Sequence, residues 1–275
     1  RQIAEQLEQQ NRWQEATVYY RQALKLSMSQ ATRQLSPSKN LNLLNSSVDK
    51  NLSVIQSTED RIDKAIERYQ QQVINNPKSV KTMTDLGNLY TKKRQWQLAI
   101  NCYRQAIEIN PKYAQAHLNL ARVLVKLGRQ SEFIEQMKVA IALKPNLASA
   151  TDRFNLGNAL LKQEKPDLAI NYYYQAIAID PSFYQAYYRL GEVLNEQENH
   201  DHAAKIYQNL VKQNPKDADS YYLLGQQLEK LKKWDKAVKA YSKVLELQPR
   251  FPQASKKLNH ALAEKLRLDL EAKRK

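Results

Sequence analysis

Residues 218–249 read ADSYYLLGQQLEKLKKWDKAVKAYSKVLELQP, and this stretch decides the fold. Its first half carries Leu224-Gly225, its second half carries Ala237 and Tyr241, and a proline closes it. Prolines recur along the chain at spacings of 34, 34, 36, 34 and 34 residues, namely at Pro77, Pro111, Pro145, Pro181, Pro215 and Pro249. A fixed period in this range predicts a repeat protein, in which each unit buries its apolar face against the next.

Three other markers recur in register with the prolines. Leu-Gly pairs stand at Leu86-Gly87, Leu156-Gly157, Leu190-Gly191 and Leu224-Gly225, with Leu120-Ala121 as a variant. An alanine stands twelve places before the proline at Ala65, Ala99, Ala169, Ala203 and Ala237, with Phe133 as the exception. Eight places before the proline stand Tyr69, Tyr103, Met137, Tyr173, Tyr207 and Tyr241. Glycine or alanine lets two helices approach closely, so we expect these residues to form the core within each unit.

With these residues the chain resembles the tetratricopeptide repeat (TPR) family, whose pattern is W-x2-L-G-x2-Y, then A-x3-F, then P. The resemblance implies an all-α fold, a right-handed superhelical solenoid of antiparallel helix pairs. The tryptophan position departs most from the pattern, being Met83, His117, Arg153, Tyr187 and Tyr221. The longer interval before Pro181 predicts a longer connection ahead of the first helix of that unit.

The register also predicts how the chain is organised. We expect a truncated TPR unit over 1–28, a loop over 29–40, an irregular TPR unit over 41–79, five consecutive TPR units over 80–251, and a capping helix with a basic tail over 252–275. One side of the capping helix is predicted to carry Ala254, Leu258, Ala261, Leu262, Lys265 and Leu268. Its outer face should be polar, because solenoid ends need a polar cap for solubility. The chain begins with Arg1 rather than Met, so we expect it to be a fragment.

Composition restricts the classes of partner. No run of about 18 apolar residues occurs, so we expect no membrane insertion. The single cysteine, Cys102, excludes an internal disulfide and fits a reducing, cytoplasmic compartment. The net charge of +15 raises the question of nucleic acid. Acidic residues interleave with the lysines of residues 218–275, however, which favours a solvated helix face and makes a nucleic-acid partner unlikely.

Catalytic signals are weak. The four histidines, His117, His200, His202 and His260, occur in separate units or in a polar turn, without the spacing of a triad or a metal site. A glycine-rich phosphate loop is also missing. The sequence therefore predicts no enzyme, no cofactor and no metal.

The resemblance implies that ligands bind on the concave face, which the first helix of each unit lines. The predicted groove residues are the amides Asn88, Asn119, Asn155 and Asn158, the basic residues Lys92, Arg122, Lys126, Lys162 and Arg189, and the aromatic residues Phe154, Tyr188 and Tyr222. Amides can bind an extended peptide backbone, and the lysines would favour acidic residues. Structural alternatives stay open: the asparagines as solvated residues, the lysines as partners of the helix dipole, and the tyrosines as packing between neighbouring first helices.

The sequence thus predicts a protein-interaction scaffold that binds an extended peptide or partner segment, with acidic and apolar parts, in the concave groove. The basic residues of the carboxylate clamp in chaperone-binding TPR domains are missing. One alternative is a substrate-recruiting TPR arm of a larger enzyme such as a glycosyltransferase. A second alternative is anionic-polymer or nucleic-acid binding through the basic ends. Partner identity and homo-oligomer formation stay open.

Overall fold

The computed structural model describes residues 59–273. The predicted unit over 1–28, the predicted loop over 29–40 and the start of the irregular unit lie outside the described residues. The chain divides into two compact units, Arg1–Glu67 and Arg68–Lys275. The described part of the first unit is helical, and everything below concerns the second unit by itself.

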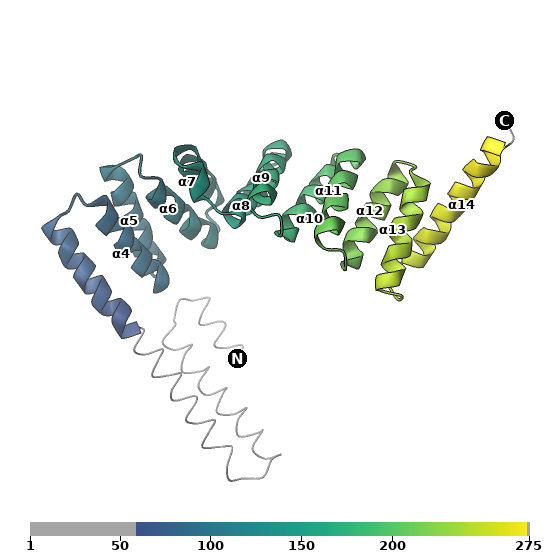
Figure 1. The fold of residues 1–275 in the computed structure, drawn as a ribbon. Helices are drawn as coiled ribbons and strands as arrows, with labels where there is room; N and C mark the ends of the chain where they lie inside the picture. The colour runs from purple at the N-terminus through teal and green to yellow at the C-terminus, as the bar shows by residue number, and fades with distance from the viewer. Residues whose placement is uncertain (1–58, 274–275) are drawn as a thin grey trace, which may run out of the picture. The chain divides into compact units, whose positions relative to one another are not determined.

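The second unit consists of helices, and the described residues contain no strand. Helical residues extend to 75, and the helices that follow lie side by side in the order of the chain (Figure 1). They are α4 (Val80–Lys92), α5 (Trp96–Ile109), α6 (Ala114–Lys126), α7 (Gln130–Leu143), the 3-10 helix η1 (Pro145–Leu147), α8 (Ala150–Leu161), α9 (Pro166–Ile179), α10 (Tyr184–Glu196), α11 (His200–Gln213), α12 (Ala218–Lys230), α13 (Trp234–Leu247) and α14 (Ala254–Lys273).

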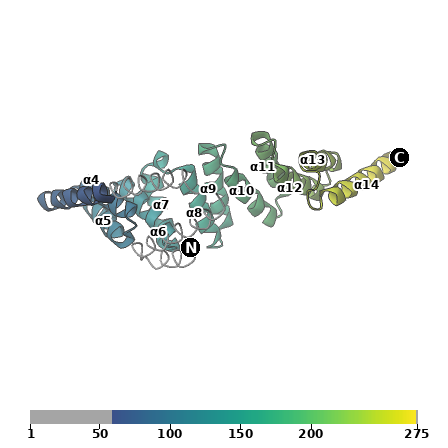
Figure 2. The same cartoon turned by 90° about the horizontal axis from the view of Figure 1, so that it is seen from below.

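Helices pack as consecutive pairs, each with a short turn between its members. The pairs are α4 with α5, α6 with α7, α8 with α9, α10 with α11, and α12 with α13, while α14 packs on α13. The view from below shows the same order of elements (Figure 2). We call α4, α6, α8, α10 and α12 the first helices and their partners the second helices. The predicted all-α solenoid of helix pairs is confirmed.

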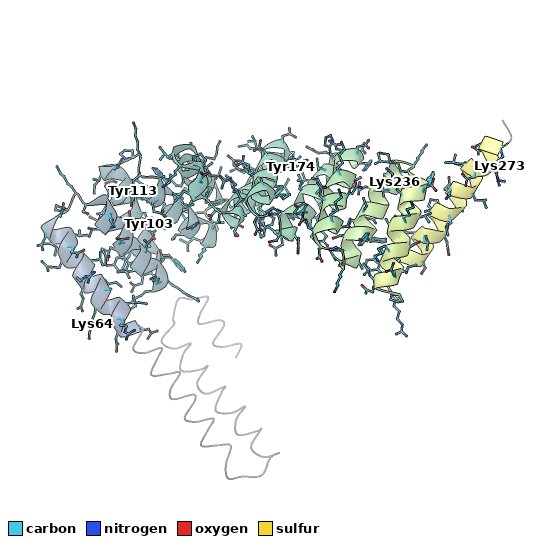
Figure 3. All side chains as sticks on the ribbon, in the orientation of Figure 1. Lys64, Tyr103, Tyr113, Tyr174, Lys236 and Lys273 are labelled. Carbon is cyan, nitrogen blue, oxygen red and sulfur yellow. The ribbon has the colours of Figure 1, made fainter. Side chains whose placement is uncertain are left out.

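Tyrosines of the second helices form the centre of the core. Tyr103, Tyr173, Tyr207 and Tyr241 are at most 1% exposed, and Met137 at the equivalent place is fully buried. The prediction that Tyr173 belongs to the core is therefore confirmed. Its neighbour Tyr174, labelled in Figure 3, is 41% exposed.

Each tyrosine ring lies against a glycine of its partner helix. A Cβ added to Gly87, Gly157, Gly191 or Gly225 would come within 2.4 to 2.6 Å of the tyrosine sixteen residues later. The unit that has Ala121 in place of glycine has Met137 in place of tyrosine. The Leu-Gly position is therefore small because an aromatic ring occupies the space beside it.

Polar partners of the tyrosine hydroxyls differ between units. Tyr103 donates to Asn88 and Tyr173 donates to Asn158, each at 2.8 Å. Tyr241 donates to Glu229 at 2.8 Å. The hydroxyl of Tyr207 has no hydrogen-bond partner among residues 59–273.

The turns between first and second helices share one left-handed residue. Arg94, Glu164, Glu198 and Lys232 have φ of 55° to 57°, and Gly128 at the equivalent place has φ of 71°. The residue after each of them donates its N–H to a carbonyl five residues earlier, as Gln95 does to Tyr90. This bond is typical of helices that end in a left-handed residue. The turn therefore forms with or without glycine.

The predicted longer connection is confirmed, because η1 fills the segment between α7 and α8. Arg153 stabilises it: its guanidinium donates to the carbonyls of Pro145, at 2.5 Å, and of Ala148. It also donates to Gln175 at 3.0 Å. Arg153, only 5% exposed, stands at the tryptophan position of the repeat and uses its charge to satisfy backbone carbonyls that the extra residues leave without helical partners.

The predicted outer face of the capping helix needs correction. Ala254 and Ala261 of α14 are buried as expected, but Leu262 and Leu268 are 43% and 40% exposed. Leu266 and Leu270 are exposed as well. The far half of α14 extends past α13 (Figure 1), so these leucines lack the neighbour that would cover them among the described residues.

Candidate functional site

The first helices carry all the predicted groove residues. Asn88 and Lys92 lie on α4, Asn119, Arg122 and Lys126 on α6, Phe154, Asn155 and Asn158 on α8 with Lys162 at its end, Tyr188 and Arg189 on α10, and Tyr222 on α12. We call the side of these helices that carries the predicted groove residues the first-helix surface. Its residues divide into those that other side chains already engage and those with free polar groups.

Asn88 and Asn119 belong to the first group. The Oδ1 of Asn88 accepts hydrogen bonds from the Tyr103 hydroxyl at 2.8 Å and from Nδ2 of Asn119 at 2.7 Å. The Oδ1 of Asn119 accepts from Gln115 at 2.8 Å, and Asn119 is only 9% exposed. These two amides therefore connect α4, α5 and α6, and the Nδ2 group of Asn88 is left without a hydrogen-bond partner among the described residues.

Arg122 forms an ion pair with a carboxylate that the sequence analysis missed. Its guanidinium donates Nε and Nη2 to the two carboxylate oxygens of Asp152 at 3.0 and 2.6 Å. Asp152 is also the fourth member of the motif Ser149-x-x-Asp152, and the two residues form a capping box at the start of α8. That motif before an apolar run was a readable signal for a helix start.

The environment of Asp152 decides its protonation. Burial alone would raise the pKa of this carboxyl, but hydrogen bonds from Arg122 and Ser149 outweigh burial and hold the pKa below its ordinary value of 3.8. The hydrogen bond to Asp152 likewise raises the pKa of Arg122. Both groups are charged at neutral pH, so Arg122 is neutralised and adds little to a basic surface.

Two of the three predicted aromatic residues, Phe154 and Tyr222, each pack against a ring of their own unit and a ring that follows that unit. Phe154 contacts Tyr173 and Phe183, with ring centroids 5.7 and 5.1 Å apart. Tyr222 contacts Tyr241 and Phe251 at 5.8 and 5.0 Å.

The third predicted aromatic residue makes polar contacts instead. The Tyr188 hydroxyl donates to Asp217 and lies 2.9 Å from the hydroxyl of Ser220. All three aromatic side chains are half-buried. These contacts agree with the alternative in which the aromatic residues pack against neighbouring residues of the chain. Only the part of each ring that stays exposed could contact a ligand.

The predicted basic residues of the first-helix surface differ in whether they have an interaction partner. The ammonium of Lys126 lies 5.4 Å from the centre of the Trp96 ring, and Arg189 pairs with Glu192 at 2.8 Å. Lys92 and Lys162 are exposed and have no hydrogen-bond or ion-pair partner within the described part of the chain. Lys92 and Lys162 are therefore available on this surface.

The α8 helix and the residue at its end carry three side chains with free polar groups. Asn155 has no hydrogen-bond partner among residues 59–273, and Asn158 uses only its Oδ1, which accepts from Tyr173. Asn155, Asn158 and Lys162 are three and four residues apart, so they share one face of the helix. Two half-buried amides and an exposed ammonium thus stand in a line.

The histidines are engaged in local structure. His200 shares a hydrogen bond with Gln227 at 2.9 Å, and His202 with Asn199, the N-cap of α11, at 2.8 Å. The described residues contain no group of three or more His, Cys, Asp or Glu side chains that could hold a metal ion. Over the same residues, no helix has the length and apolar character needed to cross a bilayer.

Comparison with protein families gives four matches. Residues 87–128 match "TPR repeat", and residues 114–147, 160–228 and 218–251 match "Tetratricopeptide repeat". No curated protein matches the chain.

Solved structures with the same fold include YrrB, described as a TPR protein with an unusual peptide-binding site. It has a TM-score of 0.57 and 22% identity, over 69% of this chain and 96% of YrrB. The MamA protein has a TM-score of 0.51 and 26% identity, over 64% of this chain and 94% of MamA. The C-terminal part of a TPR repeat-containing protein from Cytophaga hutchinsonii has a TM-score of 0.51 and 20% identity, over 66% of this chain and 71% of that one.

Proposed function

This chain belongs to the tetratricopeptide repeat family of protein-interaction scaffolds, and we propose that it binds an extended peptide on its first-helix surface, with α8 at the centre of the contact. The observation that carries the proposal is the line of Asn155, Asn158 and Lys162. A peptide backbone offers an N–H and a C=O at every residue, and a side-chain amide can bind both.

The free amides have the right neighbours for this role. Half-buried amides lose less water when a ligand covers them than fully exposed ones, so their hydrogen bonds contribute more to affinity. Phe154, one turn before Asn158, presents the exposed edge of its ring to an apolar side chain. Lys162 adds a positive charge that would favour an acidic residue.

Residues whose polar groups other side chains already engage are left out of the proposed contact. Asn119 and Arg122 were predicted to bind the ligand, but their hydrogen bonds to Asn88 and Asp152 support the packing of successive units. Substituting Asn119 would therefore change stability, and a loss of binding in such a variant would carry little information. Asn155 is the sharper probe.

The test begins with selection of peptides from a random library on the full chain. For a selected peptide, Asn155→Ala should weaken binding about fivefold, because one hydrogen bond contributes about 1 kcal/mol. Adding Lys162→Gln should weaken it further. The matched control is Asn209→Ala with Lys212→Gln on the exposed side of α11, which should leave affinity unchanged.

Titration calorimetry gives the affinities, and circular dichroism verifies that each variant folds. If selected peptides bind the α8 variants and the α11 variants equally well, the assignment to the first-helix surface is wrong. Failure to select any peptide that depends on Asn155 has the same meaning.

A further inference from the structure

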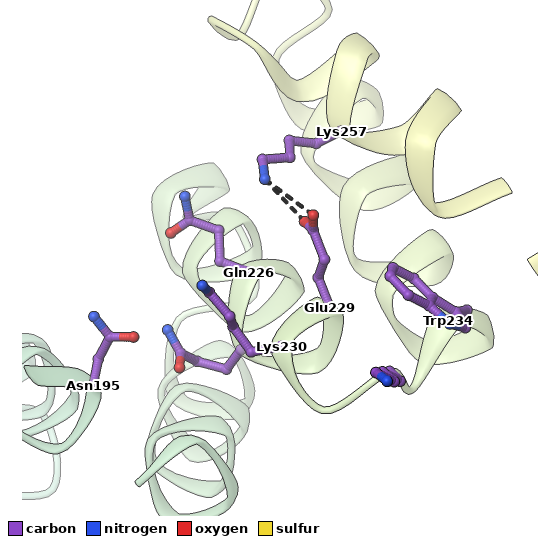
Figure 4. A pocket seen from close by; sticks show the side chains of 8 residues that line it. Asn195, Gln226, Glu229, Lys230, Trp234 and Lys257 are labelled. Carbon is purple, nitrogen blue, oxygen red and sulfur yellow. Dashed lines mark hydrogen bonds and ion pairs between the residues drawn. The ribbon is translucent and has the colours of Figure 1, made fainter. Parts of the chain in front are cut away.

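A cavity of about 480 Å³ lies at the C-terminal end of the solenoid. Its walls come from the ends of α10 and α12, from the turn after α12, and from the starts of α13 and α14 (Figure 4). Asn195 lines it from α10, and Gln226 and Lys230 line it from α12. Gln226 and Lys230 occupy the same places in their unit as Asn158 and Lys162 do in theirs, so the cavity belongs to the first-helix surface.

The one acidic residue in the wall is already neutralised. Both carboxylate oxygens of Glu229 accept from the ammonium of Lys257 at 3.1 Å, and the Tyr241 hydroxyl donates to it at 2.8 Å. His260 approaches the same carboxylate at 3.6 Å. Glu229 is therefore held by its neighbours, as Figure 4 shows, and repels an incoming anion weakly.

Two cations of the wall remain unpaired. Lys230 and Lys232 line the cavity, are exposed, and have neither an ion-pair nor a hydrogen-bond partner within residues 59–273. Lys232 occupies the left-handed place of its turn, with φ of 55°. After Glu229 and Lys257 cancel, the cavity carries two positive charges, and an anion is the ligand that such a site attracts.

The remaining groups favour a carboxylate on a peptide. Asn195 and Gln226 have no hydrogen-bond partner in the described part of the chain, so each can donate an amide N–H to an oxygen or bind a backbone group. Trp234 adds an apolar wall on the other side of Glu229 (Figure 4); its ring stands edge-on to His260 with centroids 5.7 Å apart. A glutamate side chain has a short apolar stem and a carboxylate, which match this pairing of indole with ammonium and amide groups.

We propose that this cavity binds a carboxylate of the peptide that the first-helix surface holds, either an acidic side chain or the terminal carboxylate. The inference rests on the proposed function and names the chemistry of one end of the ligand. Lys230 and Lys232 supply the charge, Asn195 and Gln226 the neutral donors.

Three short peptides test it on the full chain: tetraglutamate with both ends blocked, tetraglutamine with a free C-terminal carboxylate, and tetraglutamine with both ends blocked. The readout is the indole N–H resonance of Trp234, identified with Trp234→Phe, together with titration calorimetry. Blocked tetraglutamate should shift this resonance if side-chain carboxylates bind, and tetraglutamine with the free end should do so if the terminal carboxylate binds. Equal shifts with fully blocked tetraglutamine overturn the proposal.

Two charge-matched double variants provide the control. Lys230→Gln with Lys232→Gln should weaken binding of the acidic peptide roughly tenfold, since each charged hydrogen bond contributes strongly. Lys236→Gln with Lys239→Gln on α13 removes the same charge from exposed residues outside the cavity and should change affinity less than about twofold. Equal losses in both pairs would mean bulk attraction and refute the site.

This proposal and the previous one can fail separately. If selected peptides depend on Asn155 while none of the carboxylate probes binds at the cavity, the cavity proposal is wrong and the peptide-binding function stands. If the acidic probe depends on Lys230 and Lys232 while no selected peptide depends on Asn155, the cavity binds carboxylates but the assignment to α8 is wrong.

Discussion

The backbone of Gly157 lies against the ring of Tyr173, so closely that a Cβ at residue 157 would stand 2.6 Å from ring atom Cε1. Equivalent pairs recur in three other units, and the remaining unit combines Ala121 with Met137. The tyrosine ring therefore occupies the space that a side chain at the glycine position would need. A methionine, with three flexible bonds, tolerates the methyl group that a rigid ring cannot.

We expect Gly157→Ala to destabilise the chain by about 1–3 kcal/mol through overpacking, despite the better helix propensity of alanine. Adding Tyr173→Met should recover part of this loss, since the pair then matches Ala121 and Met137. Urea unfolding followed by circular dichroism measures the effect. Strict additivity of the two substitutions would contradict the packing argument.

A substitution at Gly128 measures the cost of the left-handed backbone conformation separately from any packing cost. Nothing lies within 4 Å of a Cβ added there, so the cost of Gly128→Ala comes from its φ of 71° and should be about 1 kcal/mol. The reverse change at the equivalent turn, Glu164→Gly, relieves a left-handed residue and should stabilise by roughly 0.5 kcal/mol after the entropy cost of glycine. Thermal melts of both variants give the signs. A stabilising Gly128→Ala would rule out the strain.

The pair of Arg122 and Asp152 predicts a pH dependence. The pKa of Asp152 is lower in the folded chain than in the unfolded chain, so its contribution is present above pH of about 4 and is lost as pH falls through the folded pKa. Asp152→Asn should cost about 1–3 kcal/mol at neutral pH, with Arg122 partly screened by solvent, and less in acid.

Urea unfolding at several pH values measures this difference. The control is Asp201→Asn, whose carboxylate pairs with Lys233 on the surface at 2.8 Å with 60% of its side chain exposed. A difference between the Asp152 variant and the unaltered chain that stays constant down to acid pH would mean that the carboxylate charge does not carry the interaction.

Two asparagines at the same place of neighbouring units should behave differently. Asn119→Ala removes the 2.7 Å hydrogen bond to Asn88 and should lower stability by about 1 kcal/mol. Asn155→Ala removes no hydrogen bond among the described residues and should leave the melting temperature unchanged. Equal effects of the two substitutions on the melting temperature would be incompatible with the hydrogen-bond assignment.

Two core tyrosines make a similar comparison. Tyr173→Phe breaks the hydrogen bond to Asn158 and should cost about 1 kcal/mol. Tyr207→Phe removes a buried hydroxyl that has no partner within residues 59–273, so it should be neutral or slightly stabilising. Midpoints of chemical unfolding distinguish the two. A large loss for Tyr207→Phe would reveal an interaction of that hydroxyl that the contacts do not account for.

The repeat register predicted the helix pairs and the core because both depend on contacts within one unit. Tyr173 and Gly157 lie sixteen residues apart in one unit, and the register predicted that both belong to the core of that unit, although their direct contact is visible only in the structure. The candidate site was harder, because its hydrogen bonds join neighbouring units. Asn88 bonds to Asn119 and Arg122 to Asp152, thirty or so residues away, and a position on a helix does not say which partner a long side chain selects.

The left-handed turns have a consequence for how such a chain can diverge or be engineered. Their backbone stays the same whether the residue is Arg94, Gly128, Glu164, Glu198 or Lys232. Because the two helices of a pair are antiparallel and every pair repeats the same order, these five positions follow one rim of the solenoid. Single substitutions can therefore change the sign of charge along that rim without repacking a helix, at the small conformational cost of a left-handed residue. The same positions can carry new binding groups in an engineered chain.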